Sequence, residues 1–152
     1  MKAIIADPMK CTGCRTCELI CSFFKEGECN PSKSRISVFK NEELGLDFPI
    51  ACLHCETPAC MEACPTGAIA KRDDGLVVVD RDRCTGCGMC ARACPFNAIK
   101  IDPEKRKALV CDLCGGTPKC VEWCSTGAIK LGDITDDFLK REKSYIVLLF
   151  RR

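Results

Sequence analysis

CTGCGMCARACP, residues 84–95, is the stretch that decides the fold of this chain. Its cysteines follow the spacing C-x2-C-x2-C-x3-C-P, with which thiolates hold cubane iron–sulfur clusters. Three further quartets repeat this spacing with small changes. The four quartets are Cys11, Cys14, Cys17 and Cys21; Cys52, Cys55, Cys60 and Cys64; Cys84, Cys87, Cys90 and Cys94; and Cys111, Cys114, Cys120 and Cys124. They leave only Cys29 over, and their thiolates suffice for four 4Fe–4S clusters.

The spacing within each quartet has a geometric meaning. A C-x2-C-x2-C loop can turn its three side chains inward around one compact object. The x3 step would place the fourth cysteine one helical turn further on, so that Cys94 shares a helix face with Cys90. The fourth cysteine of such a run ligates the neighbouring cluster when two clusters are present. The spacing therefore predicts clusters in close pairs, as electron hopping requires.

Disulfide bonds and zinc are the structural alternatives for so many cysteines. A disulfide framework needs an oxidising compartment and usually an even cysteine count. The count here is odd, and the N-terminal MKAIIADPMK has no apolar signal region. Zinc sites usually join two well-separated cysteine pairs, whereas each quartet here lies within 11 to 14 residues. We therefore expect iron–sulfur clusters in a cytoplasmic protein.

Length and composition agree with a small protein built around cofactors. The chain has 152 residues, enough for one domain or two small ones, and only 6% aromatic residues. A conventional core would be thin, so the clusters would act as staples. Bound thiolates and cluster cores would shift the formal charge from +2 to about −6, which favours a mildly basic partner face. Mixed charges without a basic run argue against nucleic acid, and no apolar run is long enough to span a membrane.

A seven-residue motif recurs every 30 residues. Its copies are ACPTGAI (63–69), ACPFNAI (93–99) and WCSTGAI (123–129). Each copy predicts a short helix with the fourth cysteine, a turn, and a strand that begins near the Ala-Ile pair. Hairpins should follow the first two copies, with turns at Asp74-Gly75 and Asp102-Pro103. The resulting βαββαβ arrangement predicts one inner module over residues 50–104.

The segments outside this inner module complete the predicted organisation. Residues 1–29 and 105–131, with the first and fourth quartets, would form an outer module. Residues 30–49 would connect the two, with a strand over 35–40 and a turn near 44–46. In the tail, 132–152, we expect Asp133 to cap a short helix and residues 145–150 to form a strand. The tail would either join this chain's own sheet or dock against a partner subunit or a second copy.

The span from Cys11 to Ile129 resembles the four-cluster iron–sulfur subunits of molybdenum and tungsten oxidoreductases, formate dehydrogenases, hydrogenases and carbon monoxide dehydrogenase. The opening CTGCRTCELICSFFKEGECNPSKSRI is most similar to the small subunit of tungsten-containing aldehyde oxidoreductases. CLHCETPACMEACP and CDLCGGTPKCVEWC share a Thr-Pro pair before the third cysteine. The resemblance implies an α+β fold of tandem bacterial-ferredoxin-like modules with pseudo-twofold symmetry.

The resemblance also implies which cysteines share a cluster. The four sets are Cys11, Cys14, Cys17 and Cys124; Cys52, Cys55, Cys60 and Cys94; Cys84, Cys87, Cys90 and Cys64; and Cys111, Cys114, Cys120 and Cys21. Two serines depart from the pattern, since Ser22 and Ser125 stand where Pro65 and Pro95 follow the inner fourth cysteines. Such a serine either donates to a cluster sulfur and raises its potential, or merely replaces a proline that shapes the turn.

The function implied is that of an electron-transfer subunit without catalytic residues of its own. It would relay single electrons between a tungsten or molybdenum catalytic subunit, which oxidises an aldehyde in an anaerobic cell, and an acceptor. That acceptor would be a flavin- or NAD-linked subunit or a soluble ferredoxin. The alternative is a stand-alone polyferredoxin that diffuses between enzymes. A cluster-based redox sensor is a third class, but the chain has no recognisable effector or nucleic-acid-binding segment.

Three further residues carry open interpretations. His54, between Cys52 and Cys55, either couples a proton to reduction or fills its loop and bonds to the backbone. Cys29 is either a redox thiol or a small buried apolar residue. Trp123 is expected to pack beside its cluster.

Overall fold

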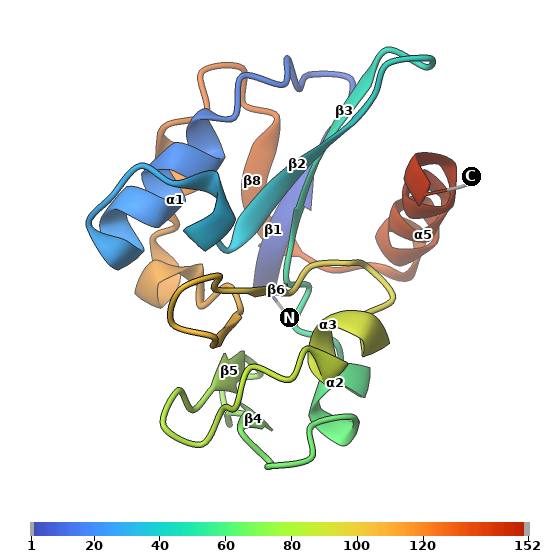
Figure 1. Ribbon diagram of the computed structural model, residues 1–152. Helices are drawn as coiled ribbons and strands as arrows, with labels where there is room; N and C mark the ends of the chain where they lie inside the picture. The colour runs from blue at the N-terminus through green and yellow to red at the C-terminus, as the bar shows by residue number, and fades with distance from the viewer. Residues whose placement is uncertain (1, 151–152) are drawn as a thin grey trace.

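The computed structural model describes residues 2–150 and shows a mixed fold of short helices and small sheets (Figure 1). The helices are α1 (Thr16–Glu26), α2 (Ala59–Glu62), α3 (Met89–Ala93), α4 (Lys119–Glu122) and α5 (Asp136–Phe150), with 3₁₀ turns η1 (Pro31–Lys33) and η2 (Leu113–Gly116). The strands are β1 (Lys2–Ala6), β2 (Ile36–Asn41), β3 (Leu46–Ala51), β4 (Ile69–Lys71), β5 (Val77–Val79), β6 (Lys100–Ile101), β7 (Ala108–Leu109) and β8 (Ile129–Asp133). They pair as four antiparallel two-stranded sheets.

Both hairpins predicted after the motif copies are confirmed. β4 pairs with β5 and β6 pairs with β7, each in an antiparallel register. In the second hairpin the buried Asp102 carboxylate accepts the backbone N–H groups of Glu104 and Lys105, both at 2.9 Å. This side-chain bond is the usual reason that aspartate begins a turn. The local turn chemistry of the sequence therefore specifies these hairpins.

β1 pairs with β8, so the two ends of the cysteine-rich region lie side by side (Figure 1). The register pairs Ala3 with Gly132, and a Cβ on Gly132 would lie 2.6 Å from the Ile5 Cδ1 atom. Helix α1 packs against α4 in the same part of the molecule. The strand Lys2–Ala6 was not predicted, because its partner lies more than a hundred residues away in sequence.

The connecting segment forms a hairpin, where only one strand and a turn were predicted. The expected strand over 35–40 is present as β2, but it pairs along its whole length with β3, which was not predicted. This second strand was not predicted because it contains Pro49, and proline lacks a backbone donor and is unusual within a sheet. In the observed register Val38 faces Pro49 and Ile36 faces Ala51, so the hairpin runs up to the second quartet.

The predicted strand over residues 145–150 is wrong, because these residues belong to the single helix α5. Phe138 and Glu142 are buried, and the Tyr145 ring lies 5.1 Å from that of Phe48 on β3. Positions i, i+4 and i+7 share one helix face, so the tail packs through a helical stripe. The helix is capped at a different residue from the one predicted. The Thr135 hydroxyl, rather than Asp133, accepts the N–H of Phe138 at 3.2 Å.

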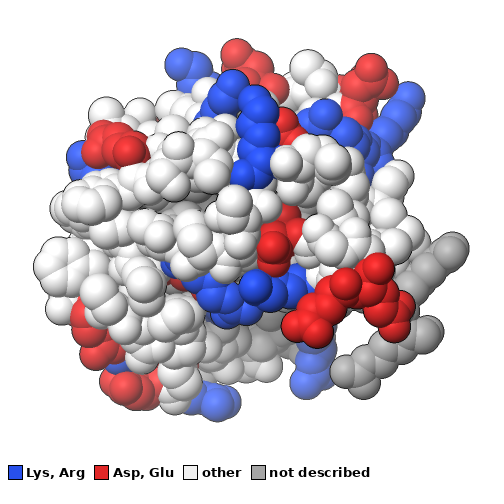
Figure 2. Space-filling model, turned by 90° about the horizontal axis from the view of Figure 1, so that it is seen from above, with Lys and Arg blue, Asp and Glu red and all other residues white. Residues whose placement is uncertain are grey.

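Charged side chains are interspersed on the upper face of the molecule (Figure 2). Lysines and arginines alternate there with acidic side chains, without a large area of one sign. No helix among residues 2–150 is long and apolar enough to cross a membrane.

Glu142 gives the fold a testable pH dependence. Burial raises the pKa of its carboxyl to about 7, against an ordinary value of 4.5. Between these values the folded state binds more protons than the unfolded chain, so stability should fall as pH rises through this window. The loss is about 3 kcal/mol from the shift alone. We expect Glu142→Gln to raise the thermal unfolding midpoint at pH 8 and to change it little at pH 5.

The matched control for this prediction is Glu43→Gln, which alters an exposed carboxylate in the β2–β3 turn. It should leave both midpoints unchanged. Equal effects of Glu142→Gln at the two pH values would show that the Glu142 carboxyl does not titrate in this window.

Candidate iron–sulfur sites

The three motif copies build the same turn around the fourth cysteine of each run. In every copy the backbone N–H three residues after the fourth cysteine donates to that cysteine's carbonyl oxygen. The donors Gly67, Asn97 and Gly127 bond to Cys64, Cys94 and Cys124 at 3.2, 3.2 and 3.1 Å. All three donors have a positive φ, of 60°, 52° and 64°. Glycine adopts this conformation freely and asparagine tolerates it, which explains the residue types in the motif.

This turn also points backbone donors at the fourth sulfur. The N–H of Ala68 lies 3.3 Å from Cys64 Sγ, and that of Ala98 lies 3.4 Å from Cys94 Sγ. Burial by itself raises the pKa of the Cys64 thiol, but hydrogen bonds from Thr66 and Ala68 outweigh it and lower the pKa. The turn therefore favours the thiolate form, which is the form that binds metal.

The spacing predicted that the fourth cysteines of the three motif copies lie inside helices, and this prediction is wrong. Helices α2, α3 and α4 contain the third cysteines and end before the fourth. Cys94 follows the end of α3 in an extended conformation, with φ −72° and ψ 114°. A residue before proline is disfavoured in the α region, and Pro65 and Pro95 follow the inner fourth cysteines. Only in α1 do the third and fourth cysteines, Cys17 and Cys21, share one helix.

One cavity of the inner region is lined by four cysteines from two runs. They are Cys84, Cys87 and Cys90 from the third run and Cys64 from the second. The loop of the third run passes close to another backbone segment, because a Cβ on Gly86 would collide with the carbonyl oxygen of Arg106. Gly86 also has a φ of 70°, so both the close approach and the backbone conformation require glycine.

A second inner cavity has the complementary lining. It is bounded by Cys52, Cys55 and Cys60 from the second run and Cys94 from the third. Apolar side chains complete the wall, among them Val77, Phe96 and Ile99. Each inner cavity thus combines three cysteines of one run with the fourth of the other. Among residues 2–150 no three His, Cys, Asp or Glu side chains converge closely enough to hold a single metal ion.

The outer cysteines influence one another across the first and fourth runs. Burial raises the pKa of the Cys11 thiol, and the charges of Cys14 and Cys124 raise it further. Burial likewise raises the pKa of Cys120, with added contributions from Cys111 and Cys21. The structure therefore brings Cys124 close to the first run and Cys21 close to the fourth.

The sulfur environments fit iron–sulfur clusters. Burial raises the pKa of the Cys60 thiol to about 11 and that of Cys111 to about 12, so these thiols would stay neutral at pH 7 without a metal. Backbone N–H groups nevertheless donate to two of the buried sulfurs. The His54 N–H donates to Cys52 Sγ and the Leu113 N–H to Cys111 Sγ, both at 3.5 Å. Iron binding converts such thiols to thiolates, which these donors then stabilise. The Nε2 atom of His54 is also buried without a partner among residues 2–150.

The structure shows the hydrogen bonds of Ser22 and the solvent exposure of Cys29 and Trp123. The Ser22 hydroxyl donates to the Leu19 carbonyl and accepts the Asn30 N–H, each at 2.9 Å, so it serves the helix and the following loop. Helix α1 continues through Ser22, where a proline would break it. Cys29 is exposed, which contradicts the expectation of a buried residue. Trp123 is half-exposed, at 55%.

His54 is completely buried and bonds to the backbone, as one of its two interpretations predicted. Burial lowers the pKa of its ring to about 4. The N–H of Val77 donates to its Nδ1 atom at 3.0 Å.

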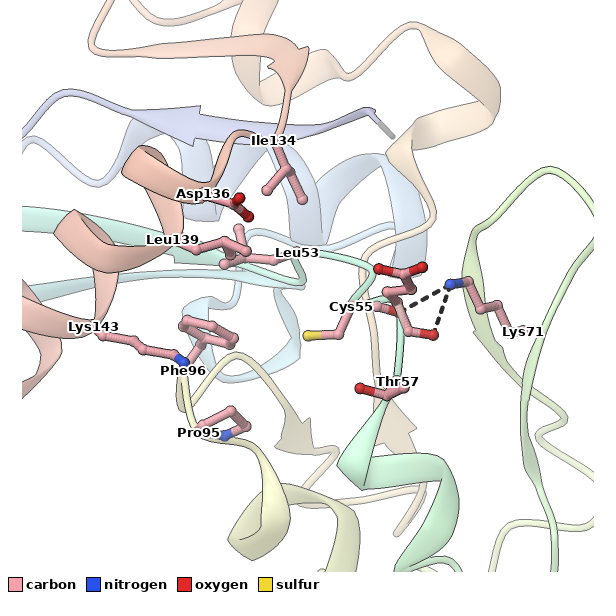
Figure 3. A pocket seen from close by; sticks show the side chains of 11 residues that line it. Leu53, Cys55, Thr57, Lys71, Pro95, Phe96, Ile134, Asp136, Leu139 and Lys143 are labelled. Carbon is pink, nitrogen blue, oxygen red and sulfur yellow. Dashed lines mark hydrogen bonds between the residues drawn. The ribbon is translucent and has the colours of Figure 1, made fainter.

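An open pocket adjoins the second inner cavity and shares Cys55 with it (Figure 3). The Cys55 sulfur points toward the side where Pro95 and Phe96 lie, and Lys143 reaches the same side from α5. On the other side the Lys71 ammonium donates to the carbonyl oxygens of Cys55 and Glu56, at 3.2 and 3.0 Å. A cation therefore anchors the backbone of this cysteine loop.

This arrangement defines the class of protein, a small scaffold whose cysteine loops enclose iron–sulfur clusters. Residues 44–134 match the 4Fe-4S dicluster domain, and residues 8–23 match a 4Fe-4S binding domain. The first match spans more than half of the chain, which therefore belongs to the 4Fe-4S dicluster domain family. The chain accordingly binds several 4Fe–4S clusters.

Curated relatives are components of oxidoreductases. One component of the anaerobic dimethyl sulfoxide reductase of Escherichia coli (strain K12) is 42% identical over 96 residues, covering 55% of this chain and 47% of that protein. The polyferredoxin-like subunit of aliphatic sulfonate oxidoreductase from Pyrococcus furiosus is 44% identical over 88 residues, covering 57% and 50%. The chain spans about half the length of the curated relatives it matches.

A solved structure extends the similarity over the whole chain. It belongs to the BamBC active-site complex of benzoyl coenzyme A reductase with benzoyl-CoA, and is 30% identical with a TM-score of 0.54. The match covers 99% of this chain and 91% of that one.

Proposed function

We propose that this chain is a non-catalytic electron-transfer subunit with four 4Fe–4S clusters, each of which accepts and passes one electron. The observation that carries the proposal is the pair of inner cavities, each lined by four cysteines drawn from two runs. The outer cysteines would bind two more clusters in the crossed pattern, with Cys124 joining the first run and Cys21 the fourth. The inner and outer modules would then repeat one design, related by pseudo-twofold symmetry.

Cysteines of different sets approach one another at three points, which supports an order for the four sites. Burial raises the pKa of Cys120, whose set includes Cys21, and the charge of Cys17 from the first set raises it further. Burial raises the pKa of Cys52, and the charge of Cys111, from the same set as Cys120, raises it further. Burial raises the pKa of Cys60, and the charge of Cys90 adds to that effect. The proposed path therefore runs from the first set through the sites of Cys111 and Cys52 to the site of Cys90.

Lysines beside the inner sites support redox tuning by fixed charge. The Lys71 ammonium bonds to the carbonyl oxygen of Cys55, and the Lys107 ammonium bonds to that of Cys84 at 2.6 Å. A bound cluster with four thiolates carries net negative charge, and a nearby cation makes reduction easier. These side chains would hold the two inner potentials above those of an unshielded cluster.

The catalytic partner would be another subunit of an oxidoreductase complex. The relatives' names include a dimethyl sulfoxide reductase and an aliphatic sulfonate oxidoreductase, which supports such a partner. We propose a tungsten or molybdenum partner, with aldehyde oxidation as the sequence-based choice and a role in a formate dehydrogenase, hydrogenase or carbon monoxide dehydrogenase complex as the alternative. Val147 and Leu148, exposed on α5, would contribute to that contact. Cysteines that serve as metal ligands must stay reduced, so the proposed setting is the cytoplasm.

Metal content tests the cofactor part of this proposal. Anaerobically prepared protein should contain about sixteen irons and sixteen acid-labile sulfides per chain, since four clusters each have four of both. Stoichiometric zinc without labile sulfide would end the iron–sulfur interpretation.

Affinity capture from native cells tests the partner part. A catalytic subunit should co-purify in stable stoichiometry, and its own metal and cofactor can be measured directly. Replacing Val147 and Leu148 with lysine should weaken that complex while the iron content stays constant. Recovery of the chain alone from native extracts would favour the stand-alone polyferredoxin.

A further inference from the structure

His54 occupies a demanding position in the loop of the second run. The residue is completely buried, and its φ of 49° places its backbone in the left-handed region. Histidine is tolerated there better than most residues, but the conformation is still unfavourable for a residue with a Cβ. Its own N–H donates to the Cys52 sulfur, so backbone and side chain both face the cluster loop. Such a conformation persists only where the surrounding structure holds it in place.

The hydrogen bond from Val77 determines where the ring proton lies. The Val77 N–H donates to Nδ1, so Nδ1 is an acceptor without a proton. In a neutral imidazole the proton is then on Nε2, which becomes a donor. Val77 is itself buried in strand β5, so solvent does not compete for this bond. The ring is therefore held in one tautomer.

The Nε2 atom has no hydrogen-bond partner among residues 2–150, although it is fully buried. A buried donor without a partner is unfavourable, and native structures seldom leave one uncompensated. No protein group among residues 2–150 compensates it. The natural acceptor is a sulfur of a bound cluster, which carries negative charge.

The surroundings of the ring place it where the inner and outer sites meet. Its Nδ1 atom lies 3.8 Å from the sulfur of Cys52, which belongs to the second inner cavity. Asp112, next to Cys111 of the outer region, lines one pocket together with Leu76, the neighbour of Val77. Cys111 also lies near Cys52, since its charge adds to the effect of burial in raising the pKa of Cys52.

We infer that the His54 Nε2–H donates a hydrogen bond to a cluster sulfur at this junction and raises the reduction potential of that cluster. The inference rests on the proposed electron-transfer function. Reduction adds one electron and makes the cluster more negative, so a fixed donor stabilises the reduced form more than the oxidised form. His54 is thus a positioning residue that eases the step between the two halves of the path.

The two bonds of the ring can be separated by substitution. His54→Asn places a carbonyl oxygen near the Nδ1 position, so it can still accept the Val77 N–H, but it has no donor at the Nε2 position. His54→Gln places an amide N–H near the Nε2 position and loses the bond to Val77. The readout is an EPR-monitored redox titration of anaerobically purified protein, with iron and sulfide measured in each variant.

We expect His54→Asn to lower the potential of one cluster and His54→Gln to retain most of the native value. A change of about tenfold in the reduction equilibrium corresponds to 59 mV for one electron. The identity of the shifted signal tells whether the acceptor belongs to the Cys52 site or the Cys111 site. An unchanged potential in His54→Asn, or equal shifts in both variants, overturns the inference. A wild-type potential whose pH slope disappears in both variants overturns it as well, because the ring would then take up a proton.

If the variants fail to assemble clusters, a measurement on the wild-type protein still tests the inference. With ¹⁵N-labelled histidine, pulsed ENDOR of the reduced protein should show nitrogen and exchangeable-proton couplings from the single histidine. Their absence contradicts the inference. If iron and sulfide are absent from the wild type, the proposed function fails instead, so the two failures are distinguishable.

Discussion

Cys94→Ala should destroy the cluster of the second run and spare that of its own run. The cavity that Cys94 lines is formed otherwise by Cys52, Cys55 and Cys60. The other inner cavity takes its fourth cysteine from Cys64. Removing Cys94 therefore leaves the second run with three ligands and the third run with all four. Iron content should fall from about sixteen to about twelve per chain if the cluster is lost outright.

EPR of the reduced variant identifies which cluster is affected. The signal lost should be the one that Cys55→Ala also removes, whereas Cys87→Ala should remove a different one. Cys29→Ala is the matched control, because it deletes the exposed cysteine outside the four quartets and should leave the iron content unchanged. Loss of the signal that Cys87→Ala removes, with the other intact, would falsify the crossed assignment.

Glu26→Gln should destabilise the protein by about 3 kcal/mol, at the lower end of the range for breaking a buried ion pair. The Glu26 side chain is 3% exposed and lies at the end of α1. Its carboxylate bonds to Arg35 at 2.5 Å, to Arg81 at 3.1 Å and to Lys105 at 2.5 Å. Removing the charge leaves these three cations close together, and the partial exposure of Arg81 and Lys105 moderates the cost.

This carboxylate joins parts of the chain that belong to different predicted modules. Helix α1 lies in the outer part, Arg81 precedes the third run, and Lys105 lies in the β6–β7 turn. Weakening this contact should loosen the inner region from the outer one, with slower electron transfer between the two pairs of sites. Urea unfolding of the holoprotein under anaerobic conditions measures the stability change.

The pH dependence distinguishes Glu26 from Glu142. Burial opposes ionisation of Glu26, but the Lys105 and Arg35 contacts outweigh it and lower the pKa to about 2. Its contribution is therefore complete above the ordinary value of 4.5 and is lost only as pH falls toward 2. Between pH 6 and 8 the cost of Glu26→Gln should stay constant.

Glu122→Gln is the control for Glu26→Gln. It removes a carboxylate that is 48% exposed and paired with Lys119, and should cost less than about 1 kcal/mol. Equal costs of the two substitutions would mean that the Glu26 contacts contribute no more than a surface pair.

The features that the sequence predicted well depend on neighbouring residues. The hairpins at Asp74-Gly75 and Asp102-Pro103 follow from turn chemistry within a few positions, and the 4Fe–4S chemistry follows from spacing within each run. The errors arose where distant segments decide. A strand was predicted over 145–150 because an apolar run cannot by itself tell a strand from a buried helix, and Phe48 on β3 supplies the partner that favours the helix.

The sequence by itself determined the number and spacing of the thiolates, the class of metal centre and the local turns, because these depend on residues within about one helical turn or hairpin. The tertiary structure alone decided that β8 returns to β1, that Glu26 gathers cations from three segments and that the His54 ring is fixed by Val77. Each of these contacts joins residues that are separated in sequence. Their geometry depends on how the whole chain packs, which no local pattern of residues records.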